Sequence, residues 1–168
     1  MNILETLPKG FAGTTKRLNG IFAQMSQEEM HFRAFGNTNP LIWQIGHLNY
    51  VRNTIMKLID SNAKLELMEN EKELFGPNCQ ITNPEAYPHP TTLMEVFEAR
   101  GQRIIEMLQT ATPEQLAAES PFAHLSFFGP SRADQIYGFF LHENQHYGEA
   151  NMTRTIIVKN RTLSEVFG

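Results

Sequence analysis

Two histidines four residues apart, His142 and His146, are the strongest chemical signal in the chain. They open and close the pentapeptide H-E-N-Q-H at 142–146, in a stretch whose apolar periodicity predicts a helix. At that spacing two imidazoles project from one helix face about 5–6 Å apart at Cβ, which is close enough to bind one metal ion. The pentapeptide also matches H-E-x-x-H, the pattern of zinc peptidases.

A third histidine, His47, favours a different kind of site. It lies far upstream in the sequence G-H-L at 46–48, beside Trp43 on a second predicted helix. In a helix bundle, facing helices supply ligands from distant parts of the sequence. Three imidazoles leave coordination positions free for water or substrate, as in a catalytic metal site. We therefore predict that His47, His142 and His146 bind one divalent cation.

Two other interpretations of the histidines stay open at this point. A peptidase of the long zincin form needs glycine and histidine further along the motif, where this chain has Glu149 and Met152. No sheet is predicted that could hold a peptide substrate, so a peptidase is disfavoured. The second interpretation is structural: each histidine is an ordinary core or rim side chain that is hydrogen-bonded to a protein neighbour.

Glu143, next to one of the predicted ligands, is a candidate general base. That role requires its side chain to turn inward, toward the metal and substrate. The alternative is a solvated or structural glutamate. Gln44 and Asn49 are candidates for a hydrogen bond to His47 that would orient its ring.

The periodicity of apolar residues predicts four long helices, at roughly 8–30, 40–60, 92–109 and 131–158. Asn39 is the predicted cap of the second helix, with Pro40 at its first position. A short helix is predicted to begin at the sequence T-P-E-Q, 112–115. Strand-like alternation is nearly absent. We therefore predict an all-α fold, a four-helix bundle made by a single domain over residues 1–168.

Residues 61–91 are the least regular part of the sequence, and they contain several Gly, Pro and Asn turn signals. A connection of this length in a compact domain is usually either functional or disordered. We expect a substrate to approach the predicted metal from this side.

Composition limits the classes of partner. The chain has 168 residues, of which 41% are apolar, so it can bury a substantial core. The net charge of −4 and the absence of a Lys/Arg block disfavour nucleic acid and anionic membranes as partners. No apolar run approaches the length of a membrane span, and the N-terminal residues do not resemble a signal peptide. One cysteine, Cys79, excludes an intrachain disulfide and agrees with a cytoplasmic location.

Two stretches together resemble the DinB-like superfamily of helix bundles. The sequence N-P-L-I-W-Q-I-G-H-L at 39–48 is similar to the family's second-helix signature, and F-L-H-E-N-Q-H-Y-G at 140–148 is similar to its fourth-helix pattern. The resemblance implies an up-down-down-up bundle that is often a homodimer. It also implies a divalent metal, usually zinc or nickel, bound by His47, His142 and His146.

The resemblance also suggests a reaction. Characterised relatives transfer low-molecular-weight thiols such as bacillithiol to electrophiles, or isomerise maleylpyruvate with mycothiol. A metal that binds the thiol sulfur would keep it as a thiolate near neutral pH, ready to attack a small electrophilic substrate. A non-catalytic metal-binding protein and a metal-assisted hydrolase stay open as alternatives.

The chain departs from the family pattern at two places. Glu149 and Ala150 stand where many relatives have Gln-Ile, and Val51 and Arg52 stand where many have an acidic residue. The predicted ligands are retained, while the surroundings of the metal and the substrate pocket differ.

Overall fold

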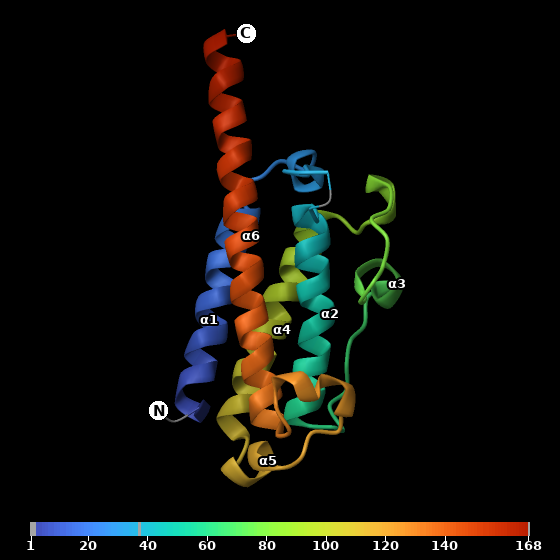
Figure 1. The fold of residues 1–168 in the computed structure, drawn as a ribbon, viewed down its shortest axis with the longest axis vertical. Coiled ribbons are helices and arrows are strands. Elements are labelled where there is room, and N and C mark those ends of the chain that lie inside the picture. The colour runs from blue at the N-terminus through green and yellow to red at the C-terminus, as the bar shows by residue number, and fades with distance from the viewer. Residues whose placement is uncertain (1–2, 37, 168) are drawn as a thin grey trace.

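The structure, a computed structural model, describes residues 3–36 and 38–167. The four long helices lie side by side; α1 and α6 run in one direction, and α2 and α4 run in the opposite direction (Figure 1). The described residues contain no strand and only one isolated bridge, between Glu119 and Ser131. The predicted all-α fold is therefore confirmed. The long helices are α1 (Ile3–Phe22), α2 (Leu41–Ile59), α4 (Pro90–Thr110) and α6 (Arg132–Phe167).

The interior of the bundle consists of two apolar clusters with a polar layer between them. Helices α1 and α2 each pack against both α4 and α6. One cluster contains Leu18, Leu48 and Phe97, and the other contains residues such as Phe11 and Ile104. All four helices contribute buried polar side chains to the layer that separates the clusters: Thr14, Thr15, Asn49, Arg52, Arg100 and Glu143.

The first helix ends earlier than the sequence predicted. Helix α1 stops at Phe22, and a separate 3-10 turn, η1 (Glu29–His31), follows. Ser26 and Glu29 explain this break, because each backbone N–H donates to the other's side chain, at 2.8 and 3.2 Å. This reciprocal arrangement is a capping box, which starts a new helical turn. The sequence S-Q-E-E at 26–29 therefore starts a new helical turn and does not continue α1.

The second helix agrees with its prediction, but its cap does not. Pro40 occupies the cap position of α2 and no side chain caps the helix. Asn39 instead uses its backbone carbonyl, which accepts a hydrogen bond from the Gln44 side chain at 3.0 Å. The predicted capping role of Asn39 is wrong, because the helix begins one residue later than expected.

Residues 61–91 include two short helices, α3 (Glu71–Phe75) and η2 (Pro84–Ala86). Helix α3 packs against α2. The predicted short helix is also present as α5 (Pro113–Ala117), with a complete capping box between Thr112 and Gln115. A further 3-10 helix, η3 (Ala123–Phe128), leads into α6.

Helix α6 continues well beyond its predicted end near residue 158. Its C-terminal part extends past the other long helices (Figure 1). An ion pair between Arg161 and Glu29 joins this part to η1. The apolar periodicity could not predict this tertiary contact between charged side chains. Within the described chain, no helix has both the length and the apolar character needed to cross a membrane.

Candidate metal centre

The structure brings His47 of α2 together with His142 and His146 of α6, although 95 residues separate the first two. The Nε2 atoms of His47 and His142 are 3.1 Å apart. One ring nitrogen from each of the three lies within 4.8 Å of the others. This arrangement arises because α2 and α6 are neighbours in the bundle and the two α6 histidines share one helix face.

The ring of His47 is oriented by a backbone carbonyl. Its Nδ1 lies 2.8 Å from the carbonyl oxygen of Phe75, the last residue of α3. A carbonyl can only accept, so Nδ1 carries the proton and Nε2 presents a lone pair toward His142. The expected partners Gln44 and Asn49 do not have this role, because their side-chain nitrogens donate to the carbonyls of Asn39 and Leu93.

Gly46 explains why α3 can approach His47 so closely. A Cβ atom at this position would lie 2.1 Å from Cε1 of the Phe75 ring. Real atoms cannot approach that closely, so only glycine lets the ring pack directly on the helix backbone. The glycine that precedes His47 in the sequence therefore makes room for the residue that orients it.

Trp43 covers one face of the His47 ring. The two rings are stacked, with centroids 4.7 Å apart and an angle of 8° between their planes. The indole N–H of Trp43 points to the sulfur of Cys79 at 3.0 Å, and the Cys79 thiol donates to the carbonyl of Leu74. The Cys79 thiol thus links Trp43 to the carbonyl of Leu74 in α3.

Glu149 lies beside the third histidine. One of its carboxylate oxygens is 3.1 Å from Nδ1 of His146, which is an ion-pair distance. The geometry of this contact is not that of a regular hydrogen bond. Interaction with His146 lowers the pKa of the Glu149 carboxyl. This position is one of the two departures from the family pattern, and it places a negative charge at the edge of the histidine cluster.

Burial keeps two of the imidazoles neutral. It lowers the pKa of His47 and of His142 to about 4, with a further lowering from the neighbouring histidine rings. Both rings are therefore uncharged at neutral pH and carry a lone pair that can bind a cation. The third ring, His146, is 5% exposed.

These residues have the donor chemistry of a metal site. In a tetrahedral zinc site with Zn–N bonds of about 2.0–2.1 Å, two ligand nitrogens lie about 3.3 Å apart. The 3.1 Å between the Nε2 atoms of His47 and His142 is close to that separation. The three histidines could therefore hold a metal ion.

A family model described as the DinB superfamily matches residues 11–150. The chain belongs to the DinB superfamily. No curated protein matches its sequence significantly. The three histidines of this DinB-superfamily chain come from the same two helices in which the sequence resemblance was found.

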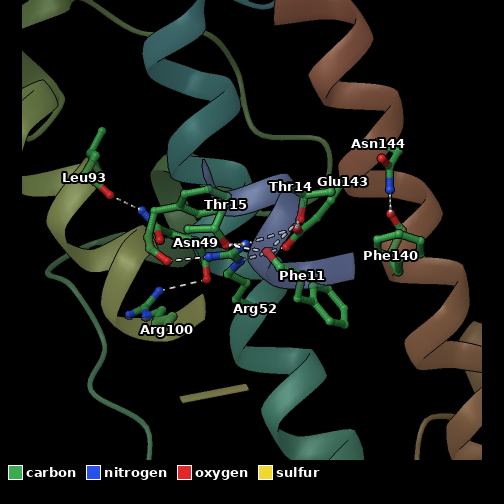
Figure 2. Close-up of polar contacts among 11 residues, drawn as sticks. Phe11, Thr14, Thr15, Asn49, Arg52, Leu93, Arg100, Phe140, Glu143 and Asn144 are labelled. Atoms are coloured by element: carbon green, nitrogen blue, oxygen red, sulfur yellow. Dashed lines mark hydrogen bonds and ion pairs between the residues drawn. The ribbon is translucent and has the colours of Figure 1, made fainter. Parts of the chain in front are cut away.

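Glu143 is enclosed within the bundle in this DinB-superfamily structure. Its side chain is 0% exposed, so a solvated glutamate is excluded. Its two carboxylate oxygens accept hydrogen bonds from Arg52 and Thr14, at 2.8 Å each (Figure 2). A base must reach the proton that it removes, and this carboxylate is instead enclosed and paired with protein donors. The geometry supports a structural role.

Sequence reasoning missed two groups that contact the histidines and one buried ion pair of the bundle. The carbonyl of Phe75 had no signal, because a backbone group looks the same at every residue. The ion pair between Arg52 and Glu143 joins α2 to α6, and no pattern in the sequence connects these two residues. Glu149 could have been found, because residues three apart on a helix are neighbours.

The other histidines lie apart from this cluster. His89 is exposed and caps α4, accepting a hydrogen bond from the backbone N–H of Thr91. His124 is exposed in η3, next to Phe122. His31 lies in η1 beside Tyr87, where burial lowers its pKa.

Proposed function

We propose that this DinB-superfamily chain is a metal-dependent enzyme that transfers a low-molecular-weight thiol to a small electrophile. The observation that supports this proposal is the convergence of three imidazoles from α2 and α6, two of them with Nε2 atoms 3.1 Å apart. Three protein ligands leave room for a further ligand, as catalytic sites require. Zinc or nickel is the metal we propose, because imidazole nitrogen suits both ions.

A bound divalent cation would supply the positive charge that lowers the pKa of a coordinated thiol. The residues of the chain would provide the rest. The Phe75 carbonyl and the Trp43 ring hold His47 in one orientation. The Glu149 carboxylate would hold the His146 ring through Nδ1 of His146. Such carboxylate–histidine pairs are common around metal ions.

We place the electrophile on the side of residues 61–91. A hollow of about 470 Å³ lies there, with Leu74 and Tyr87 among its lining residues. Leu74 directly precedes Phe75, whose carbonyl contacts His47. A hollow of this size suits a small organic molecule. We further propose that the protein works in the cytoplasm as a homodimer, on small molecules and not on nucleic acid or membranes.

Metal binding is the first step to test. The full chain, freed of metal with a chelator, would be titrated with Zn²⁺, Ni²⁺ and Co²⁺ while the fluorescence of Trp43 is followed. Trp43 is the one tryptophan of the chain and stacks on His47, so its emission reports on this site. We expect saturation at one ion per chain. His124→Ala, which changes an exposed histidine of η3, should bind as the parent does, whereas no binding by the parent would refute the proposal.

Thiol transfer is the second step. The metal-loaded chain would be mixed with a chromogenic electrophile and, in turn, with bacillithiol, mycothiol, glutathione, coenzyme A and cysteine. We expect one thiol to react faster with the metal-loaded protein than with the metal-free protein. Metal binding without acceleration by any thiol would support a non-catalytic metal protein. Metal-dependent hydrolysis of ester or amide substrates would instead support a hydrolase.

A further inference from the structure

Helix α3 reaches the histidine cluster through its last residue, yet it is only five residues long. A helix of this length is not stable by itself. Its position must therefore be fixed by tertiary contacts. Two such contacts are present, one at each end of the helix, and together they decide where the Phe75 carbonyl lies.

The first contact is a buried ion pair. Glu71, the first residue of α3, pairs with Arg100 of α4, and their side chains are 3% and 6% exposed. The Glu71 carboxylate also accepts a hydrogen bond from the Asn53 side chain of α2, at 3.2 Å. Arg100 in turn donates to the carbonyl of Asn49, also on α2, at 2.8 Å (Figure 2). The start of α3 is thus attached to two long helices.

The second contact is apolar. The ring of Phe75 is fully buried, packs on Gly46 and stacks on Tyr87 with centroids 5.7 Å apart. Phe75 lies four residues after Glu71, about one helical turn away. The ion pair sets the position of this turn along α2, and the Phe75 ring sets its distance from α2.

We propose that the Glu71–Arg100 ion pair positions His47 for metal binding. By holding α3 in place, it keeps the Phe75 carbonyl at Nδ1 of His47, fixes the proton on that nitrogen, and directs Nε2 toward His142. Glu71 and Arg100 are positioning residues, because they act through Phe75 and make no contact with the metal site themselves. The consequence for metal affinity rests on the proposed function, whereas the consequence for the His47 ring does not.

The direct test uses the metal-free protein and requires no activity. Long-range ¹H–¹⁵N spectra distinguish a neutral imidazole protonated at Nδ1 from one protonated at Nε2. We expect His47 of the parent to carry its proton on Nδ1, and Glu71→Gln to produce a mixture of both forms. In the parent, Nη1 and Nη2 of Arg100 donate to the two carboxylate oxygens of Glu71, a bidentate ion pair. Arg100→Lys keeps both charges but cannot make the bidentate contact, so it provides the same readout if Glu71→Gln does not fold.

The control is Leu108→Ala, a buried change in the apolar cluster that contains Ile104. It should lower the melting temperature and leave the His47 tautomer as in the parent. If Glu71→Gln and Arg100→Lys also leave the tautomer unchanged, the proposed positioning role is wrong. If Leu108→Ala disturbs the tautomer as much as they do, the effect is general loosening and the proposal is equally wrong.

Co²⁺ binding gives the second readout. Changes to groups that orient a metal ligand typically weaken metal affinity about 10- to 100-fold, so we expect at least a tenfold loss for Glu71→Gln and less than twofold for Leu108→Ala. A parent that binds no metal would refute the proposed function. The tautomer spectra would still decide whether Glu71 and Arg100 position His47.

Discussion

Arg52 and Glu143 form an ion pair in the middle of the bundle, 2.8 Å from Nε to Oε1, and neither side chain is exposed. The guanidinium also donates to the hydroxyl of Thr15 (Figure 2). It donates to the carbonyl of Phe97 as well, and it lies over the Phe97 ring. The pair therefore links α1, α2, α4 and α6 at the level that separates the two apolar clusters. Gly101 provides the space, because a Cβ there would lie 2.6 Å from Nη1 of Arg52.

Removing one partner of this ion pair should be much more harmful than removing both. Arg52→Met and Glu143→Met each leave one buried charge unpaired, which costs about 3–5 kcal/mol of unfolding free energy. The double variant leaves no charge behind and should lose less than either single variant. Urea unfolding of the metal-free proteins measures this. Additive losses in the double variant would show that the two side chains are not coupled.

Replacing either α6 histidine with alanine should remove metal binding and leave the fold. Because the core is supplied by the apolar clusters, His142→Ala or His146→Ala should melt near the metal-free parent. Loss of one ligand should weaken binding by at least tenfold, about 1.4 kcal/mol or more. Metal content and thermal melting of each variant would be measured beside His124→Ala. Full metal retention would reject the ligand assignment, and complete unfolding would show a structural metal.

Two helix glycines should respond oppositely to alanine. Gly46→Ala places a methyl group against the Phe75 ring and should destabilise the fold by about 1–3 kcal/mol. Gly148→Ala places its methyl group in open space and should stabilise α6 by about 0.5–1 kcal/mol. Denaturant midpoints of the two variants provide the comparison. Equal effects would mean that Phe75 does not pack on Gly46.

The metal-free protein should lose stability as the pH falls from about 6.5 to about 4. Burial lowers the pKa of His47 and His142 in the folded chain to about 4, whereas in the unfolded chain it is near 6.5. Within this range the unfolded chain binds more protons, so acid favours unfolding. The contribution is fully present above pH 6.5 and is lost as the pH falls.

Urea midpoints of chelator-treated protein measured at several pH values between these limits test this expectation. The control is the His47→Gln/His142→Gln double variant, which lacks both titrating rings and should show a flatter profile. A parent whose midpoint changes no more than that of the double variant would contradict the lowered pKa values.

The sequence by itself determined that four long helices form and on which face of the last one His142 and His146 lie. Helical periodicity depends on local geometry, so residues four apart share a face wherever the helix packs. The residues that share this face of α6 at steps of three and four are accordingly buried: Phe139, His146, Ala150, Thr153 and Ile157. The motif around His47 likewise indicated that the helix carrying His47 would face the two histidines of α6.

Only the tertiary structure decided which groups surround the histidines. The chain has 14 basic and 18 acidic side chains, and nothing local selects Arg52 for Glu143 or Arg100 for Glu71. Those choices depend on how the helices dock, because a buried charge needs an opposite charge at the same depth. The Phe75 carbonyl at His47 depends in turn on where α3 lies, since every residue has a carbonyl and its use is decided by packing alone.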